Sequence, residues 1–452
     1  MTTLELQEEL AKLYNKNASH IAEDTSELIN KHRQQAFEDF KRLGIPSKKN
    51  EDYRYTDLMS YLKGEYSYEI APSKFSVDLD DLFRCDIPEL DTFIVLVLNG
   101  FYYKQNNPVG LPEGVIISSF AKASIQYPEI VNRHYAKYAD TKLDSLAALN
   151  TLFAQDGIFI YIPKNIKIDK PIQIINIGFS FKNLRITRRN LFVIEQDSSA
   201  SLLICDHTLC PRSFITNSLT EIYTGDNASF NVIRMQNENG NSSQISNTFV
   251  YQEANSRFSS NTISLHGGLI RNNTFAKLNG EGALNKTYGI FFGDNDQHVA
   301  NYTHIHHAKP HCESDQLFKG ILDGNSTGAF NGKILVDKFV VKTQAYQRNN
   351  NILLSKTARM NTKPQLEIYN DDVKCSHGAT VGQLDENALF YLRSRGISNQ
   401  EARHLLMYAF ADEVIADIKL DPLRQRMNEM IEKRLRGELA RCENCKVHHL
   451  GN

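Results

Sequence analysis

Short runs of alternating apolar and polar residues dominate residues 157–375. An alternation with a period of two predicts half-buried β-strands, and the Asn, Asp, Gly and Ser residues between the runs favour turns. Similar turns recur in steps of 28, 27 and 28 residues, ending at Ala200, Ala228, Asn255 and Ala283. A related segment, Gly324–Gly328, falls out of step. Near-constant spacing predicts stacked coils, so we expect a mainly β fold with a parallel β-helix core, and a β-sandwich is the alternative.

Helical patterns flank this core. The segment Leu28–Leu43 places apolar residues at helical spacing and stops at Gly44, as helices often do. Near the other end, Asp385 is suited to cap one helix, and Ser398 with Glu401 forms a capping box that opens the next. The chain therefore divides into an N-terminal helical region, a β-helix core and a C-terminal helical region, which we expect at 1–90, 91–380 and 381–452.

The candidate chemistry lies where the strand pattern gives way to helices. Val373, Cys375 and His377 share one parity, so on an extended chain they face the same side. Successive members would have Cα atoms about 6.6 Å apart, which lets a thiolate and an imidazole converge on one ion. A buried structural Cys beside a hydrogen-bonded His gives the same Cys-x-His pattern. The pair is therefore a candidate site for a metal ion.

Two stretches of this chain resemble a known family. Leu366–Thr380 and Leu389–Ile397 are similar to the C-terminal signature of SufD proteins, a branch of the SufB/SufD family of the bacterial SUF iron–sulfur cluster assembly system. Phe40–Pro46 and Glu51–Leu58 resemble the N-terminal region of the same proteins, with Tyr53 where the family often has Trp. The resemblance implies a right-handed parallel β-helix flanked by α-helical regions.

The resemblance also implies partners. SufD-like proteins pair with the related SufB through their β-helices, and this implies that Cys375 and His377 contribute to iron entry or cluster binding at that interface. The helical C-terminal end is where the SufC ATPase attaches in such proteins. SufB-like chains carry a further Cys in the preceding strand, and this chain has Asn349 near that position and no thiol there. We therefore expect a non-catalytic scaffold subunit of a SufB–SufC–SufD complex, without a tightly bound cofactor and with iron or a cluster only in transit.

Two other groups of residues have the types that bind metals. On a strand, His304 and His306 share a face, as metal ligands would, although solvated imidazoles on one coil give the same pattern. Cys442 and Cys445 have zinc-like spacing and are followed by two His residues, but the long loop that usually separates ligand pairs is missing. Both groups are secondary metal candidates.

Composition narrows the classes of function. The 452 residues include 51 Lys or Arg and 53 Asp or Glu, giving a net charge of −2 and no basic surface for nucleic acid. No apolar run reaches the length of a membrane span, and the acidic, amphipathic N-terminus does not resemble a signal peptide. The 7 cysteines lack a framework of spacings, which favours reduced thiols and a cytoplasmic location.

Other functions stay open on sequence grounds. Lys286 and Thr287 follow Asn285 and not the Gly that a P-loop requires, so ATP chemistry is expected in another subunit. A β-helix polysaccharide lyase or hydrolase would need clustered carboxylates, and the nearest pair, Asp371–Asp372, sits at a strand break where turn chemistry explains it. A structural homodimer with adventitious metal is the third possibility.

Overall fold

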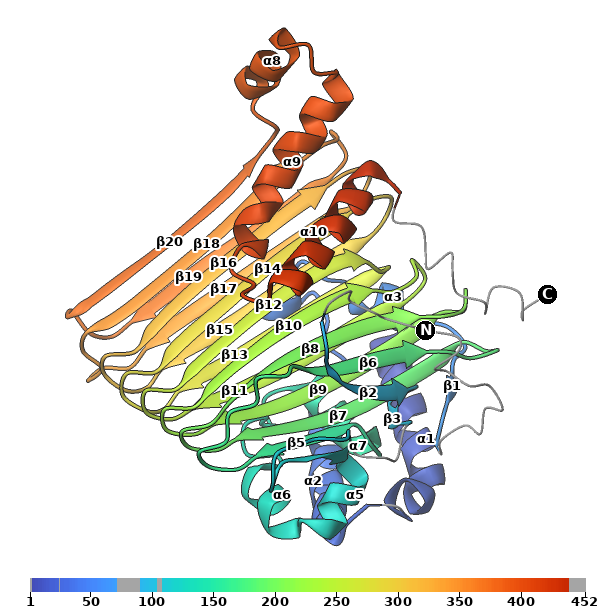
Figure 1. Ribbon diagram of the computed structural model, residues 1–452. Coiled ribbons are helices and arrows are strands. Elements are labelled where there is room, and N and C mark those ends of the chain that lie inside the picture. The colour runs from blue at the N-terminus through green and yellow to red at the C-terminus, as the bar shows by residue number, and fades with distance from the viewer. Residues whose placement is uncertain (1, 24, 71–89, 104–107, 439–452) are drawn as a thin grey trace.

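The structure is a computed structural model that describes residues 2–23, 25–70, 90–103 and 108–438. Its centre is a β-solenoid in which the chain winds through two facing sheets (Figure 1). Helices precede and follow the solenoid in the sequence. The expected mainly β fold, with a β-helix core and helical flanks, is confirmed, and the β-sandwich alternative is wrong.

Each coil contributes one strand to each sheet, and we name the sheets A and B. Strands pair in parallel along both sheets, except for β4 with β5 and β2 with β3. Sheet A comprises β1 (Ser67–Tyr68), β4 (Ile116–Ser119), β5 (Ile158–Ile162), β7 (Leu184–Ile194), β9 (Phe214–Thr224), β11 (Ser243–Gln252), β13 (Leu269–Leu278), β15 (His298–His307), β17 (Thr327–Val336) and β19 (Arg359–Ile368). Sheet B comprises β2 (Phe93–Leu98), β3 (Phe101–Tyr102), β6 (Ile172–Gly178), β8 (Ser199–Thr208), β10 (Ser229–Asn237), β12 (Arg257–His266), β14 (Leu284–Gly293), β16 (Glu313–Leu322), β18 (Thr343–Leu353) and β20 (Val373–Gly382).

The turns that lead from sheet A to sheet B stack on one another. Asn227 and Asn255 hold the left-handed backbone conformation there, with φ of 58° and 55°, which Asn tolerates better than most residues. The backbone N–H of Asn227 donates to the carbonyl of Ala254 in the next coil. Gly324 falls out of step because it belongs to the opposite corner, between β16 and β17, where it stacks on Asn295. The repeat in the sequence therefore marks one edge of the solenoid.

Helices cover the outer face of each sheet. Leu10 and Phe40 of the N-terminal helices pack with Ile245 and Leu269 of sheet A. The helices before the solenoid proper are α1 (Thr3–Glu23), α2 (Glu27–Leu43), α3 (Leu58–Leu62), α5 (Phe120–Gln126), α6 (Pro128–His134) and α7 (Ser145–Phe153), with a 3₁₀ turn at Glu51–Tyr53. The two ends of the sequence thus cover opposite faces, because the C-terminal helices lie on sheet B (Figure 1).

The C-terminal region contains three helices within the residues that the structure describes, up to residue 438. They are α8 (Glu386–Ser394), α9 (Asn399–Ile415) and α10 (Asp421–Arg436). Asp385 caps α8 by accepting two backbone N–H groups, and the Ser398 hydroxyl accepts the N–H of Glu401, as predicted. The Glu401 carboxylate, however, binds Arg436 of α10 at 2.9 and 3.1 Å. Only one of the two hydrogen bonds of the expected capping box forms, because the Glu401 side chain, which would make the other, binds α10 instead.

Candidate functional site

Cys375 and His377 lie on β20, the last strand of sheet B. In the pairing of β20 with β18, Cys375 stands opposite Ala345 and His377 opposite Gln347. Cys375 is half-buried and packs at the end of an apolar cluster that includes Val340 and Ala345, whereas His377 is exposed. The structure therefore places the pair on one strand at the end of the solenoid, with the thiol against the core and the imidazole open to solvent.

The environment of Cys375 favours the neutral thiol. Burial raises its pKa above the ordinary value, and a hydrogen bond with the backbone of Ala345 offsets only part of that rise. Lys374 is exposed and follows the opposite parity along β20, so it does not stabilise the thiolate. A cation that approaches the site is needed before this sulfur becomes a good ligand.

The last coil of the solenoid is open. Among the described residues, β19 and β20 each have a partner strand on one side only. Leu366 and Ile368 of β19, with Val373 of β20, are only half-buried, although their counterparts in earlier coils form the core. An uncovered strand edge is a template for pairing with another chain. The candidate residues thus lie at a strand edge where another chain can pair.

His304 and His306 lie together on the outer face of sheet A. Burial lowers the pKa of His304 to about 4, and Nε2 of His306 is 2.9 Å from Asp337. In the described ranges, no three His, Cys, Asp or Glu side chains converge as a metal site requires. Metal binding at the His pair stays a prediction. Cys442 and Cys445 lie outside the described residues, so metal binding there stays a prediction too.

The His-rich segment to which this pair belongs, residues 304–312, also has side chains in the interior. His307 is buried in the core, where its ring nitrogen is 2.9 Å from the Ser314 hydroxyl. The thiol of Cys312 is also buried and donates to the carbonyl of Gly280 at 3.2 Å. Burial lowers the pKa of His307 to about 3 and raises that of Cys312 to about 11. The segment is therefore divided between two environments and forms no single cluster.

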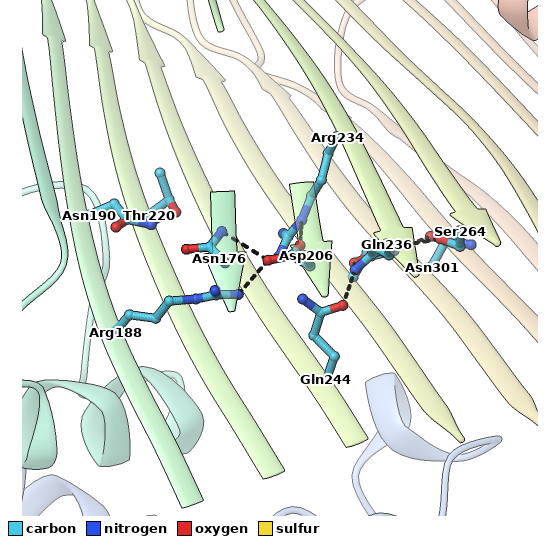
Figure 2. A network of polar contacts seen from close by, with 11 residues as sticks. Asn176, Arg188, Asn190, Asp206, Thr220, Arg234, Gln236, Gln244, Ser264 and Asn301 are labelled. Atoms are coloured by element: carbon cyan, nitrogen blue, oxygen red, sulfur yellow. Dashed lines mark hydrogen bonds and ion pairs between the residues drawn. The ribbon is translucent and has the colours of Figure 1, made fainter. Parts of the chain in front are cut away.

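A polar network fills part of the solenoid interior and was not among the predicted sites. At its centre, Asp206 of β8 accepts hydrogen bonds from Arg188 and Arg234, each at 2.8 Å, and from Asn176 at 2.9 Å (Figure 2). Burial alone would raise the pKa of Asp206, but the guanidinium groups of Arg234 and Arg188 outweigh it and hold that pKa well below its usual range. The carboxylate is therefore ionised inside the protein.

The network continues along the solenoid axis. Gln236 bonds with Gln244 at 2.7 Å and with Ser264 at 2.7 Å (Figure 2). Beside it lies Glu238, whose Oε2 has no hydrogen-bond partner in the part of the chain that the structure describes. Burial, and then the charge of Asp206, raise the pKa of Glu238 to about 7. The sequence contained a signal for this interior network, because charged residues occupy strand positions that face inward.

Helix α8 carries the most exposed aromatic residues of the C-terminal region described here. Phe390 is 74% exposed and Tyr391 is 58% exposed. The helix projects beyond the last strands, away from the solenoid body (Figure 1). Adjacent exposed aromatic residues are typical of a surface that a partner covers.

Two family models together cover most of the sequence. One, described as the SufBD protein N-terminal region, matches residues 4–174. The other, described as the SufBD core domain of SUF system FeS cluster assembly, matches residues 179–410. The chain belongs to the SufB/SufD family. The resemblance found in the sequence is thereby confirmed.

Members of the SufB/SufD family with curated descriptions align with most of the chain. It is 30% identical over 424 residues to an iron–sulfur cluster assembly SufBD family protein of Synechocystis, covering 91% of this chain and 92% of that protein. It is 29% identical over 412 residues to the iron–sulfur cluster assembly protein SufD of Escherichia coli, covering 89% and 92%. SufD of Bacillus subtilis is 28% identical over 334 residues, covering 72% and 75%.

Membership in the SufB/SufD family supports a role in iron–sulfur cluster assembly. It favours that role over the polysaccharide lyase considered from the sequence. None of the helices in the described ranges combines the length and apolar character needed to span a bilayer.

Proposed function

We propose that this protein is the SufD-like subunit of a cytoplasmic complex with a SufB-like chain and a SufC-like ATPase. It acts as a scaffold half for iron–sulfur cluster assembly and catalyses no reaction alone. The observation that carries the proposal is the open last coil of the solenoid, with Cys375 and His377 on its edge strand. The alignment with SufD proteins along the chain supports the same assignment.

The SufB-like partner pairs with the open coil. Free strand edges at β19 and β20 offer backbone hydrogen bonds, and the half-buried Leu366, Ile368 and Val373 offer apolar surface. Pairing of this kind continues the two sheets across the interface. It also buries Cys375 and His377 between the subunits.

Iron or the growing cluster is the cargo of this interface. Two ligands do not complete a four-coordinate site, so a thiolate from Cys375 and an imidazole from His377 need further ligands from the partner. Asn349, near the position where SufB-like chains carry a Cys, is fully buried and donates to the carbonyl of Phe318 at 3.1 Å. Asn349 supplies no thiolate, so we assign the acceptance of sulfur to the SufB-like chain.

The ATPase docks on the C-terminal helices. Phe390 and Tyr391 of α8 are exposed on a helix that stands clear of the sheets. Hot spots of protein interfaces are enriched in aromatic residues. Replacing both residues with Ala should release the ATPase and leave pairing with the SufB-like chain intact.

The test is anaerobic reconstitution. The protein is co-expressed with its SufB-like and SufC-like partners, purified as a complex and titrated with iron and sulfide. His377→Ala should abolish cluster formation while gel filtration shows the complex intact. Ser376→Ala, at the exposed neighbour, is the matched control and should assemble clusters at the wild-type rate. If His377→Ala assembled clusters at the wild-type rate, the assignment of the site would be refuted. If the wild-type protein formed no complex with the two partners, the proposed role would be refuted.

A further inference from the structure

A cleft lies on the outer face of sheet A, on a different part of the molecule from β20. Its volume of about 760 Å³ falls within the range of about 300–1,000 Å³ that small-molecule pockets occupy. Three parts of the chain line it: the segment around Glu51–Tyr53, the loop Lys137–Ser145, and strands β11, β13 and β15. The cleft is thus built where the N-terminal region meets the solenoid.

Aromatic rings form much of its surface. Phe249 and Phe275 stand opposite each other on β11 and β13, with ring centroids 4.7 Å apart and planes inclined by 6°. Tyr302 follows on β15, with its centroid 5.4 Å from that of Phe275. Tyr251, also on β11, stacks on Tyr138 of the loop, with ring centroids 5.0 Å apart. Such a lining suits a flat aromatic ring, which gains both burial and ring contacts there.

The cleft also has cations that the protein itself does not neutralise. Lys137 and Lys277 are exposed at the cleft and form no ion pair within the described residues; Lys277 only approaches the ring of Tyr251, at 5.9 Å. Arg271 is different, because it lies 3.8 Å over the ring of Tyr53 and two of its nitrogens, Nη1 and Nη2, donate to Thr56 and to the carbonyl of Asp52. The two lysines are therefore available to an anionic ligand.

Hydrogen-bond acceptors, one buried and two exposed, complete the chemistry of the cleft. Asn273 is 2% exposed, and its Oδ1 has no hydrogen-bond partner in the described part of the chain. The carboxylates of Asp52 and Asp140 also line the cleft and can accept N–H and O–H groups of a ligand. Asp144 caps α7, so its carboxylate is already used. A ligand that fits has an aromatic ring, hydrogen-bond donors and an anionic group.

We propose that this cleft binds a mononucleotide-sized ligand, with its base against Phe249, Phe275 and Tyr302 and its phosphate near Lys137 and Lys277. Phosphate binding by lysine uses a point charge and needs no special loop. The cleft exists only where the N-terminal region meets the folded solenoid, so the ligand binds the folded protein alone and raises its free energy of unfolding with the logarithm of the ligand concentration above Kd.

Calorimetric titration of the full-length protein tests this with four compounds. Adenosine 5′-monophosphate is the probe, adenosine lacks the phosphate, ribose 5-phosphate lacks the base, and inorganic phosphate lacks both base and sugar. The mononucleotide should bind one molecule per chain, and each truncated compound should bind at least about tenfold more weakly, as expected when a charged or aromatic contact is lost. Absence of saturable mononucleotide binding would overturn the proposal, as would equal binding of inorganic phosphate.

Matched variants separate the cleft from the rest of the surface. Lys277→Gln and Lys137→Gln should each weaken mononucleotide binding by about tenfold and leave adenosine binding unchanged. Both lysines are exposed, so these variants should fold as the wild type does. Lys182→Gln, at an exposed site that does not line the cleft, should bind like the wild type. Unchanged binding in both cleft variants would place the ligand elsewhere and refute the assignment.

Discussion

The buried carboxyl group of Glu238 makes the stability of this protein dependent on pH. Its pKa is about 7 in the folded protein, because burial and the charge of Asp206 disfavour ionisation, against an ordinary value of 4.5. The folded state therefore binds a proton more tightly than the unfolded state does. Stability that is present below pH 4.5 is lost as the pH rises through 7, and that difference in pKa corresponds to about 3 kcal/mol.

Glu238→Gln removes this loss. The amide has nearly the same shape and stays neutral, so the variant should match the wild type near pH 4.5 and exceed it by about 3 kcal/mol above pH 7. Because the chain has no Trp, urea unfolding is best followed by circular dichroism, at several pH values across this range. Glu313→Gln, at an exposed strand end, is the control and should follow the wild-type curve at every pH.

The opposite result is equally informative. Arg188 and Arg234 lie close enough to lower the pKa of Glu238, although burial outweighs them. If Glu238→Gln were less stable than the wild type at pH 8, the carboxylate would be ionised and paired with these guanidinium groups. The interior would then be a neutral network of two cations and two anions, and the reasoning from burial would be refuted.

Three further predictions concern backbone packing, thiol chemistry and helix capping. Gly280→Ala should destabilise the protein by at least about 2 kcal/mol, since an added Cβ would lie 1.9 Å from the backbone nitrogen of Ala254, whereas Gly382→Ala has open space and should unfold at the wild-type urea concentration. Cys375 should be alkylated slowly at neutral pH and faster as the pH rises, because burial raises its pKa; peptide mass mapping at a series of pH values checks this, and rapid labelling at pH 7 would contradict it. Asp385→Ala should cost about 1 kcal/mol by uncapping α8, seen as faster amide exchange confined to that helix.

The stacked coils could be predicted because the turns are chemically distinctive. Asn227 and Asn255 hold a left-handed backbone that few other residues tolerate, so their spacing appears directly in the sequence. The spacing of Gly324 is irregular only relative to the turns at one edge of the solenoid. Gly324 belongs to a separate series of turns at the opposite edge. The placement of Cys375 and His377 on one strand could also be predicted, because their spacing along the chain determines it without knowledge of the tertiary structure.

The interior network was beyond prediction for a geometric reason. Arg188 and Asp206 come from facing sheets, and Arg234 comes from the next coil, so their contacts depend on how the coils stack. The cleft beside sheet A has the same character. Its rings on β11 and β13 are in register, but its other walls come from residues far away in the sequence. Strand alternation identified which residues face inward or outward, and it did not identify which of them meet.

The open coil and the neutral thiol of Cys375 have a combined consequence under the proposed pairing. A partner that covers β20 removes water from the thiol and raises its pKa further, because nothing in the described structure supplies a neighbouring cation. Assembly alone therefore makes the sulfur a poorer ligand. An arriving iron ion reverses this, since a coordinated metal favours the thiolate and displaces the proton. The sulfur thus stays a protonated thiol, which reacts slowly with oxidants, until the interface and the metal are both present.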